Sequence, residues 1–534
     1  MSVDVRGLKI TIGGKPIVSD ADMTIADGER VGLIGSSGSG KSMIAKAMLG
    51  LLPLTAVTNG SIDMGSTEII GASERALADL RGRYVGAVFQ NPVASLNPVM
   101  TVAQQIALPL RLHYDLTKAE RADRVNALLS KVGLDLDMAG KYPHELSGGQ
   151  QQRVGIATAL ITSPRLIIAD EPTTALDSIT QRQIVDLLTS LVDDAGASML
   201  FITHDFSVLA RATTRCYVLD AGRIVESGPT ADLLAAPTTP QAQRLVAAAQ
   251  TLTLHTPRRI RMSNSSVPLL SARSITKSFG PRTARHQVLF DVSADVHAGE
   301  CLAVIGGSGS GKSTLTRIML GLESADSGSV EYERRVLFRS SVEYEGQSIV
   351  GGRKSPGFAA LRRESGLVFQ DPFSSLDPRW RVAKSVAEPL SLQRRDLNNT
   401  DIDERVAAAL TMAGLEPADF LNRYPIDLSG GQAQRVVIAR AIINEPKVIL
   451  ADEPMSAIDV AARIQILDTF AAIRAARPST AIIMVSHDLG VVQHIADRIL
   501  VLHDGRLEET GPTAEVLGNP QSDYTRQLIE AASL

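Results

Sequence analysis

The sequence predicts an α/β protein of two similar domains, each built on a parallel sheet with helices on both faces. Apolar runs that end in charged residues indicate strands buried on both faces. They occupy residues 165–170, 198–204, 447–452 and 481–487. Two glycine-rich loops, at residues 35–42 and 306–313, each follow an apolar strand (29–35 and 300–306) and open a helix (41–52 and 312–322). The strand–loop–helix order, found twice, predicts two domains of one fold.

Each copy carries the same five elements in the same order, which chance rarely produces. The order is a phosphate loop, a glutamine, the sequence LSGGQ, an Asp-Glu pair after an apolar strand, and a histidine. In the first copy these are residues 35–42, Gln90, 146–150, Asp170 with Glu171, and His204. In the second copy they are residues 306–313, Gln370, 428–432, Asp452 with Glu453, and His487.

The hydrophobic fraction is sufficient for ordinary packed cores, and the net charge gives no sign of a nucleic-acid-binding surface. The chain has 534 residues, of which 44% are hydrophobic, and a net charge of -4 at pH 7. No apolar run is long enough to cross a membrane, and charged residues interrupt the N-terminal segment, so we expect neither a membrane span nor a signal peptide. Cys216 and Cys301 lie beside apolar strand residues and are expected to be buried free thiols in a reducing compartment.

The repeat predicts the domain limits. We expect a first domain at residues 1–250, a linker at 251–268 and a second domain at 269–534. The second copy is longer between its phosphate loop and its glutamine, where SVEYE occurs at 329–333 and again at 341–345 with RRVLFRS between. Because RRVLFRS resembles the translated end of a sequencing adapter, we interpret the duplication as an assembly artefact. The alternative is a genuine insertion, which surface hairpins tolerate.

The phosphate loops need glycine because consecutive backbone N–H groups turn inward around phosphates at the start of a helix. Lys41 and Lys312 would add positive charge where charge builds on the γ-phosphate, and Ser42 and Ser313 would offer a hydroxyl to Mg²⁺. A plain glycine-rich turn is the alternative, which the GKS sequence after a strand argues against. The residues expected to hold the nucleotide are Gly35, Ser36, Ser37, Gly38, Ser39, Gly40, Lys41 and Ser42, then Gly306, Gly307, Ser308, Gly309, Ser310, Gly311, Lys312, Ser313 and Thr314.

The Asp-Glu pairs are expected to carry the chemistry. Asp170 and Asp452 end apolar strands and would hold Mg²⁺, directly or through water, while Glu171 and Glu453 would polarise the attacking water. An isolated pair of this kind is usually a helix N-cap. Its position after the phosphate loop in both copies favours the catalytic interpretation. The histidines that end the next strands, His204 and His487, are expected to contact the γ-phosphate.

LSGGQ resembles the signature of the ATP-binding cassette (ABC) family, and the other four elements fit that family over nearly the whole chain. The resemblance implies two P-loop NTPase domains of the ABC type, each with a RecA-like core, a small antiparallel β subdomain and a helical subdomain. It implies that Gln90 and Gln370 serve in catalysis and in Mg²⁺ binding. It also implies that the signature of each half completes the ATP site of the other, since a serine hydroxyl and N–H groups at a helix start bind phosphate. Those signature residues are Ser147, Gly148, Gly149 and Gln150 in the first copy, and Ser429, Gly430, Gly431 and Gln432 in the second.

The two copies differ where the nucleotide would bind. Thr314 can help hold the α-phosphate, whereas Met43 at the equivalent position cannot. Phe279 stands where the family stacks adenine on an aromatic ring, whereas the first copy has Ile12. Base stacking on an aromatic ring contributes about 1–3 kcal/mol, so weaker binding is expected at the first site. Both catalytic glutamates are present, so two competent sites are expected.

Five segments resemble the ATPases of dipeptide and oligopeptide importers. They are residues 90–106, 142–153, 370–390, 424–435 and 519–531. This resemblance implies an ATPase subunit that works with two membrane permease subunits and an extracytoplasmic solute-binding protein. The partners, not this chain, would handle the peptide-like solute. The subunit would lie peripherally on the cytoplasmic face of the inner (plasma) membrane, without nucleic acid. The alternative is a soluble tandem ABC ATPase that remodels a ribosome or nucleic acid, which the short and mostly uncharged linker argues against.

Overall fold

The computed structural model describes most of the chain. The described residues are 3–174, 176–254, 267–281, 285–343, 346–351, 355–394, 396–456 and 458–532. The chain divides into two compact units, which we describe separately. The first comprises residues 1–176, 180–251 and 459–461, and the second comprises residues 177–179, 252–458 and 462–534. Most of the expected linker lies outside the described residues, and the domain limits stay a prediction.

The first unit begins with a small antiparallel sheet. Its strands are β1 (Val3–Ile12), β2 (Lys15–Ile25), β4 (Ala56–Met64) and β5 (Thr67–Glu68), in the order β5-β4-β1-β2. Buried and exposed residues alternate over the second half of β2, where Ala21, Met23 and Ile25 are buried. This alternation is expected of a strand with one face on the core and one in water.

Parallel strands form the core of the first unit. They are β3 (Arg30–Gly35), β6 (Val85–Val88), β7 (Leu166–Asp170), β8 (Ser198–Thr203) and β9 (Arg215–Asp220), with β10 (Arg223–Pro229) antiparallel beside β9. Their order is β10-β9-β3-β8-β7-β6. Every residue of β8 is buried, as a continuous apolar run predicts for a parallel strand covered on both faces. Since parallel strands end at one edge, Gly35, Asp170 and Thr203 reach that edge together.

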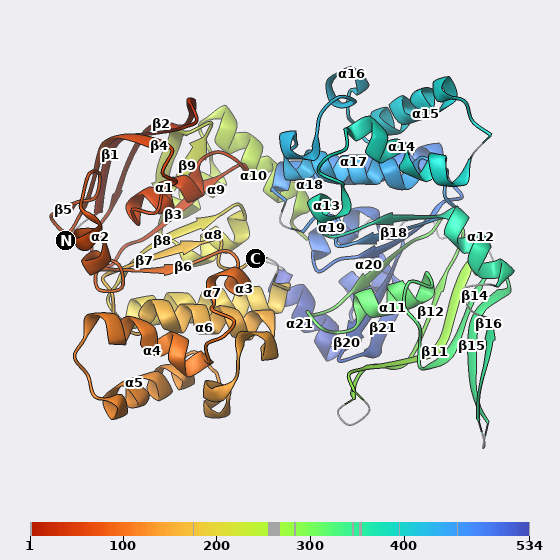
Figure 1. Ribbon diagram of the computed structural model, residues 1–534, viewed down its shortest axis with the longest axis horizontal. Helices are drawn as coiled ribbons and strands as arrows, with labels where there is room; N and C mark the ends of the chain where they lie inside the picture. The colour runs from red at the N-terminus through yellow and green to blue at the C-terminus, as the bar shows by residue number, and fades with distance from the viewer. Residues whose placement is uncertain are drawn as a thin grey trace. The chain divides into compact units, whose positions relative to one another are not determined.

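Helices cover this core and form a separate helical part. The covering helices are α1 (Lys41–Met48), α2 (Glu74–Leu80), α7 (Ser178–Asp194), α8 (Phe206–Ala212), α9 (Thr230–Ala235) and α10 (Pro240–Leu252). The helical part contains α3 (Pro92–Ser95), α4 (Val102–His113), α5 (Lys118–Lys131) and α6 (Gly148–Leu160), with 3-10 turns at Leu136–Gly140 and Pro143–Glu145. In Figure 1, α4, α5 and α6 lie together on one side of the core sheet. Helix α1 ends before the predicted residue 52 because Gly50 adopts a left-handed φ of 62°.

The second unit repeats this plan. Its core strands are β13 (Cys301–Ile305), β17 (Ser365–Val368), β18 (Val448–Asp452), β19 (Ala481–Val485), β20 (Arg498–His503) and β21 (Arg506–Pro512), in the order β17-β18-β19-β13-β20-β21. Its covering helices are α11 (Lys312–Met319), α12 (Pro356–Glu364), α18 (Val460–Ala476), α19 (Leu489–Ile495), α20 (Thr513–Gly518) and α21 (Asp523–Ala532). Its helical part contains α13 (Pro372–Ser375), α14 (Val382–Gln393), α15 (Asn399–Met412), α16 (Pro417–Phe420) and α17 (Gly430–Ile442), with a 3-10 turn at Pro425–Asp427.

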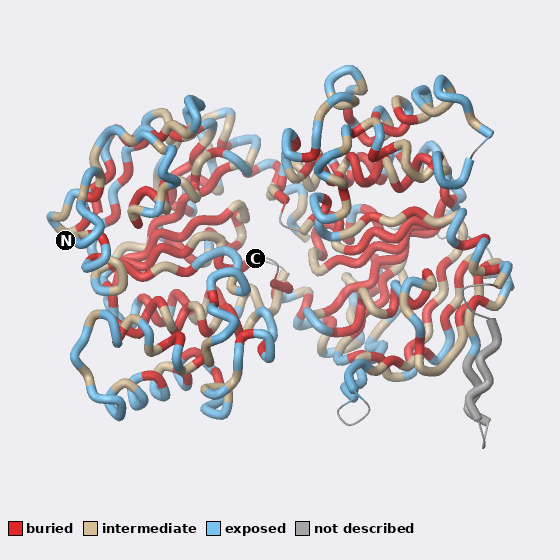
Figure 2. Tube along the Cα trace, viewed as in Figure 1, coloured by how far each residue is buried: buried red, intermediate tan, exposed pale blue. Residues whose placement is uncertain are grey.

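Burial is concentrated in the parallel strands of both units (Figure 2). Cys216 on β9 and Cys301 on β13 are buried free cysteines, as predicted. Burial raises the pKa of the Cys216 thiol to about 11 and raises the pKa of Cys301 further. Within the described ranges, no helix is both long enough and apolar enough to cross a membrane.

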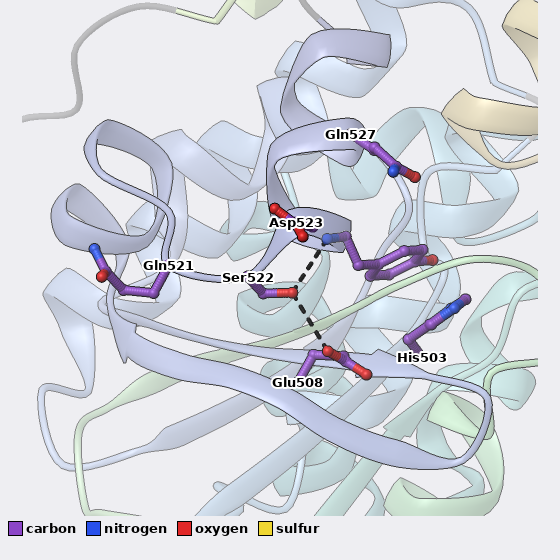
Figure 3. Close-up of a pocket in the computed structure, with 7 residues that line it drawn as sticks. His503, Glu508, Gln521, Ser522, Asp523 and Gln527 are labelled. Carbon is purple, nitrogen blue, oxygen red and sulfur yellow. Dashed lines mark hydrogen bonds between the residues drawn. The ribbon is translucent and has the colours of Figure 1, made fainter.

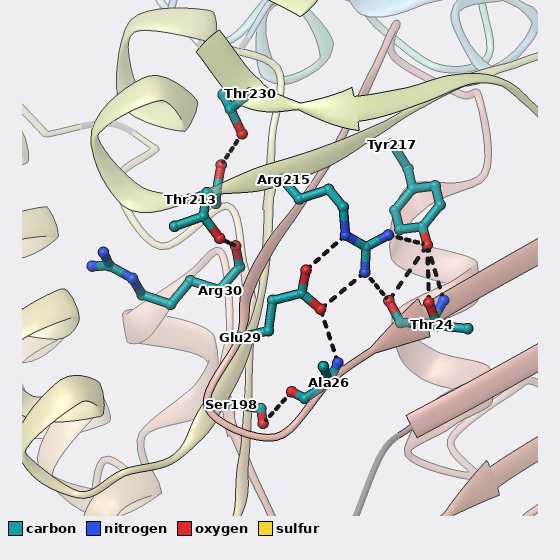
Figure 4. Close-up of polar contacts among 10 residues, drawn as sticks. Thr24, Ala26, Glu29, Arg30, Ser198, Thr213, Arg215, Tyr217 and Thr230 are labelled. Carbon is teal, nitrogen blue, oxygen red and sulfur yellow. Dashed lines mark hydrogen bonds and ion pairs between the residues drawn. The ribbon is translucent and has the colours of Figure 1, made fainter. Parts of the chain in front are cut away.

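A half-buried polar cluster joins the antiparallel sheet of the first unit to its parallel core (Figure 4). The guanidinium of Arg215 donates to both carboxylate oxygens of Glu29, at 2.6 and 2.9 Å, and to the carbonyl of Thr24 at 2.8 Å. Its third nitrogen donates to the hydroxyl of Tyr217 at 2.5 Å. This hydrogen bonding lowers the pKa of Glu29, so the pair stays ionised. The second unit has the same pair, since Arg498 donates to Glu300 at 2.6 Å.

The duplicated segment forms extra antiparallel strands in the second unit. The sheet there has the order β12-β11-β14-β15-β16 and contains β11 (Leu270–Phe279), β12 (His286–Val296), β14 (Ser327–Tyr332), β15 (Arg335–Glu343) and β16 (Gly346–Gly351). At the corresponding edge of the first unit, β4 is followed by a strand of 2 residues, β5. RRVLFRS supplies most of β15, and part of the second SVEYE lies outside the described residues.

We expect the protein isolated from its native cells to lack the duplication. Trypsin would then release one peptide that runs from Ile318 through Glu333 directly into Gly346 and ends at Arg353. A genuine hairpin insertion would instead give a separate peptide that begins at Ser340 and ends at Arg353. Peptide mass spectrometry distinguishes the two, and detection of the second peptide would overturn the artefact interpretation.

Candidate functional site

The first phosphate loop, residues 35–42, connects the end of β3 to the start of α1. Gly38 and Gly40 have left-handed φ values of 77° and 109°, which glycine adopts without steric cost. A Cβ at Gly35 would lie 2.1 Å from the carbonyl of Leu219, so the loop also needs glycine where it leaves the strand. The ammonium of Lys41 donates to the carbonyls of Gly35 at 2.8 Å and Ser36 at 2.9 Å. The lysine therefore closes the loop on itself.

The second phosphate loop, residues 306–313, has the same construction. Lys312 donates to the carbonyls of Gly306 at 3.0 Å and Gly307 at 2.7 Å. Gly309 and Gly311 have left-handed φ values of 79° and 95°. Burial lowers the pKa of both lysines, while the carboxylates that follow β7 and β18 act in the opposite direction. A buried cation at the start of a helix favours binding of an anion there.

The strand-end aspartates lie against the serines that begin α1 and α11. Ser42 donates to Asp170 at 3.1 Å, and Ser313 donates to Asp452 at 2.8 Å. Burial raises the pKa of Asp170, and the hydrogen bond from Ser42 opposes this shift. A hydroxyl and one carboxylate suit Mg²⁺, which takes few protein oxygens and leaves the remaining positions to water and phosphate.

Glu171 and Glu453 adopt a backbone conformation that is rare for a residue with a side chain. Their φ values are 46° and 48°. In each unit the backbone N–H of the glutamate donates to a carbonyl on the next strand, Ile202 at 2.9 Å or Val485 at 3.0 Å. Left-handed conformations at non-glycine residues cluster at functional sites, where the surrounding structure imposes them.

Each glutamate carboxylate contacts the glutamine and histidine of its own unit. In the first unit, Gln90 donates to Glu171 at 2.7 Å, and Nδ1 of His204 lies 3.2 Å from the same carboxylate. In the second unit, the distances from Glu453 to Gln370 and to His487 are 3.0 and 3.6 Å. Residues from the ends of three different strands thus meet at one carboxylate, as expected where parallel strands share an edge.

The electrostatics keep these carboxylates ionised. Burial acts to raise the pKa of Glu171, but the imidazole of His204 and the ammonium of Lys41 outweigh it, so the pKa lies below its ordinary value. The pKa of Glu453 is lowered in the same way by His487 and Lys312. An ionised carboxylate can only accept hydrogen bonds, which suits a group that orients water.

The signature residues form helix caps in both units. The hydroxyl of Ser147 accepts the N–H of Gln150 at 3.3 Å, and the side chain of Gln150 accepts the N–H of Ser147 at 2.9 Å. Ser429 and Gln432 make the same capping box at the start of α17. These residues therefore cap the starts of α6 and α17. The expected place of these residues opposite the phosphate loop of the other half stays a prediction.

The structure also shows contacts that the sequence interpretation missed. Thr174 donates to Glu171 at 3.0 Å, and Gln370 donates to the hydroxyl of Ser456 at 3.4 Å. Each copy has a hydroxyl residue three positions after its glutamate. This repeated position was the sequence signal that could have identified Thr174 and Ser456. In the second unit, Arg317 on α11 lies 3.4 Å from Asp452.

The fold and this site define an ATPase of the ABC class. The ABC transporter family model matches residues 18–174 and 289–456, and the chain belongs to this family, with two ABC domains in tandem. Over 99% of the chain and 96% of the relative, it is 38% identical to the peptidoglycan transport ATP-binding protein YejF of Agrobacterium fabrum. It is 36% identical to the glutathione import ATP-binding protein GsiA of Escherichia coli, over 96% of the chain and 86% of the relative. It is also 36% identical to an uncharacterised ABC transporter ATP-binding protein, YejF of Escherichia coli, over 96% of both chains.

The residues expected to face adenine end matching strands in the two units. Ile12 ends β1 and Phe279 ends β11 at matching places in the two antiparallel sheets. Phe279 is 43% exposed and has the ammonium of Lys277 4.9 Å from the centroid of its ring. The side chain of Ile12 instead packs against the apolar core.

We expect ATP to bind more weakly at the first site than at the second. Loss of base stacking corresponds to about fivefold to more than 100-fold in the dissociation constant. Titration of nucleotide into Lys312→Ala, which blocks the second site, and into Lys41→Ala, which blocks the first, compares the two. Phe279→Ile should weaken ATP binding at the second site, and equal affinities in the two parent variants would contradict the assignment.

Proposed function

We propose that this protein is the ATP-hydrolysing subunit of an ABC importer for dipeptides, oligopeptides or related small solutes. The observation that carries the proposal is the similarity, across both halves, to relatives named for peptidoglycan transport and glutathione import. Each unit also holds a complete set of loop lysine, strand-end carboxylates, glutamine and histidine.

At each site the residues take distinct roles in the proposal. The phosphate loop and its lysine bind and orient the phosphates of ATP, and the lysine offsets their negative charge. Ser42 with Asp170, and Ser313 with Asp452, hold Mg²⁺ with Gln90 and Gln370 nearby; the ion would neutralise charge on the phosphates. Glu171 and Glu453 orient the attacking water and accept its hydrogen bond, while the histidines contact the γ-phosphate. The two halves close on ATP and separate after hydrolysis.

The surface around each glutamine supports a membrane permease as partner. In the first unit, Val93 and Val99 expose 66% and 78% of their surface just after Gln90. In the second unit, a cavity of about 540 Å³ lies beside Gln370, lined by Phe369, Asp371, Ser374, Ser375, Arg317 and Arg440. Exposed apolar side chains beside a catalytic residue, as in the first unit, suit a protein partner whose movement is coupled to the nucleotide.

The two partner surfaces differ in charge. Where the second unit presents Arg379, Arg381 and Lys384, the first presents Val99, Thr101 and Gln104. The Arg379 side chain is 84% exposed and pairs with Asp377 at 2.8 Å, and the Lys384 ammonium lies 4.2 Å from the centroid of the Trp380 ring. The proposal therefore has two permease subunits whose segments facing the two units differ. A solute-binding protein outside the membrane supplies the solute, and this chain lies on the cytoplasmic face of the inner membrane.

Replacement of both proposed water-orienting carboxylates should abolish most ATP turnover. Glu171→Gln combined with Glu453→Gln keeps the side-chain size but removes the charge, and loss of such a base reduces rate by about 10²–10⁴-fold. Binding of ATP should persist, because the phosphate loops are unchanged. The matched control is Glu74→Gln, at an exposed carboxylate that pairs with Arg81. Near-normal hydrolysis in the double variant would overturn the assignment.

The importer proposal is tested by purification of the tagged chain from gently solubilised native membranes, followed by mass spectrometry. We expect two permease subunits and a solute-binding protein. As a matched variant, Arg379→Glu with Arg381→Glu should lose one permease subunit and keep both the other subunit and ATP binding. Ribosomal or purely soluble companions, with no membrane protein, would identify a remodelling ATPase instead.

A further inference from the structure

The second phosphate loop is bound by a residue from the C-terminal helix. The backbone N–H of Gly307 donates to the hydroxyl of Tyr524 at 2.7 Å. Gly307 is the second residue of the loop, and Tyr524 lies in the first turn of α21, far away in the sequence. Tyr524 belongs to none of the five repeated elements.

The glycine and the tyrosine fit each other closely. A Cβ added at Gly307 would lie 2.9 Å from the Tyr524 hydroxyl, and that oxygen is the one neighbour it would meet within 4 Å among the described residues. The φ of Gly307 is not left-handed, so the backbone itself would accept a side chain. A side chain at this position would therefore press on the Tyr524 hydroxyl.

Several contacts hold the Tyr524 ring in place. The carboxylate of Glu509 on β21 accepts the backbone N–H groups of Gln521 and Ser522 at 3.0 and 3.1 Å. The hydroxyl of Ser522 accepts the N–H of Tyr524 at 3.2 Å. The imidazole of His503 stacks on the ring, with centroids 3.8 Å apart and planes inclined by 21°. Figure 3 shows His503, Ser522 and Asp523 gathered at the start of α21, in the wall of an open cavity.

Helix α21 touches a second part of the same site. Its buried residue Leu528 packs in one apolar cluster with Leu489 and Val492 of α19. Helix α19 begins two residues after His487, which contacts Glu453. The C-terminal helix thus contacts two parts of the nucleotide site. Tyr524 contacts the phosphate loop, and Leu528 packs against α19, the helix that follows His487.

The first unit lacks this arrangement, although the rest of the segment matches. Glu226 accepts the N–H groups of Thr238 and Thr239, at 2.8 Å each, as Glu509 does in the second unit. Counting from these anchors, Gln241 stands in place of Tyr524, and Asp220 at the end of β9 stands in place of His503. The second loop residue is Ser36 instead of Gly307. The positions of Gly307, His503 and Tyr524 are therefore all occupied by different residue types in the first unit.

We propose that Tyr524 is a positioning residue of the second nucleotide site, through which helix α21 holds the phosphate loop ready for ATP. A loop fixed before the ligand arrives loses less freedom on binding, so the ligand binds more tightly. The second site then has a source of affinity that is separate from the aromatic ring of Phe279. The inference depends on ATP binding by the ABC fold and does not depend on the transport role.

The hydroxyl keeps its acceptor role across the physiological range. Burial raises the pKa of Tyr524 to about 12, so the group stays neutral well above pH 8.

The test uses the full chain with the first site blocked by Lys41→Ala. In this background Tyr524→Phe removes the hydroxyl and keeps the ring against His503. We expect the dissociation constant and KM for ATP to rise about threefold to tenfold, as for loss of one hydrogen bond, with kcat unchanged. Without nucleotide the thermal unfolding midpoint should stay the same, and the rise in midpoint on adding ATP should shrink.

A double-mutant cycle distinguishes positioning of the phosphate loop by Tyr524 from a general loss of structure. Gly307→Ala should weaken ATP binding when Tyr524 is present and have no further effect in Tyr524→Phe, because the added methyl group then meets nothing. The matched control, Gln241→Ala in the Lys312→Ala background, should leave the affinity of the first site unchanged. Unchanged ATP affinity in both Tyr524→Phe and Gly307→Ala would overturn the proposal. So would a lowered midpoint without nucleotide combined with an undiminished response to ATP.

Discussion

The site in each unit depends on one backbone constraint, the left-handed conformation of the glutamate that follows the strand-end aspartate. Such a conformation costs about 1–3 kcal/mol at a residue with a side chain. It persists because the glutamate N–H is hydrogen-bonded to the neighbouring strand, to Ile202 in one unit and Val485 in the other. The turn it creates directs the aspartate toward the serine of the helix and the glutamate toward the glutamine and histidine. Two adjacent carboxyl groups therefore reach different partners.

The sequence predicted the strands, the loops and the grouping of the site residues, because these follow from local pattern. A buried parallel strand is a continuous apolar run, and Asp170 and His204 stand directly after such runs. The two domains of the ABC type are confirmed. The sequence could not predict the positive φ of Glu171, since nothing in its identity requires it. It also gave no indication of the contact between Gly307 and Tyr524, which only the packing of α21 brings together.

Comparison of the two units distinguishes the side-chain contacts that both sites share from the residues that differ between them. The lysine bonds to the loop carbonyls, the serine–aspartate bond, and the glutamate contacts to glutamine and histidine occur in both units, with distances that differ by a few tenths of an ångström. The differences lie at the edges of the site, at Ile12 and Phe279 and at Ser36 and Gly307. The central geometry is therefore common to the two sites, while the surroundings that set affinity differ.

The two buried cysteines have a practical consequence for measuring movement in this protein. Cys216 and Cys301 are fully buried, and their raised pKa values keep the thiols protonated at neutral pH. Since the thiolate is the reactive form, neither should react readily with a thiol-directed fluorophore or spin label while the chain is folded. They are the only cysteines in the sequence. A cysteine introduced at a chosen surface position would therefore report on that position against an unlabelled background.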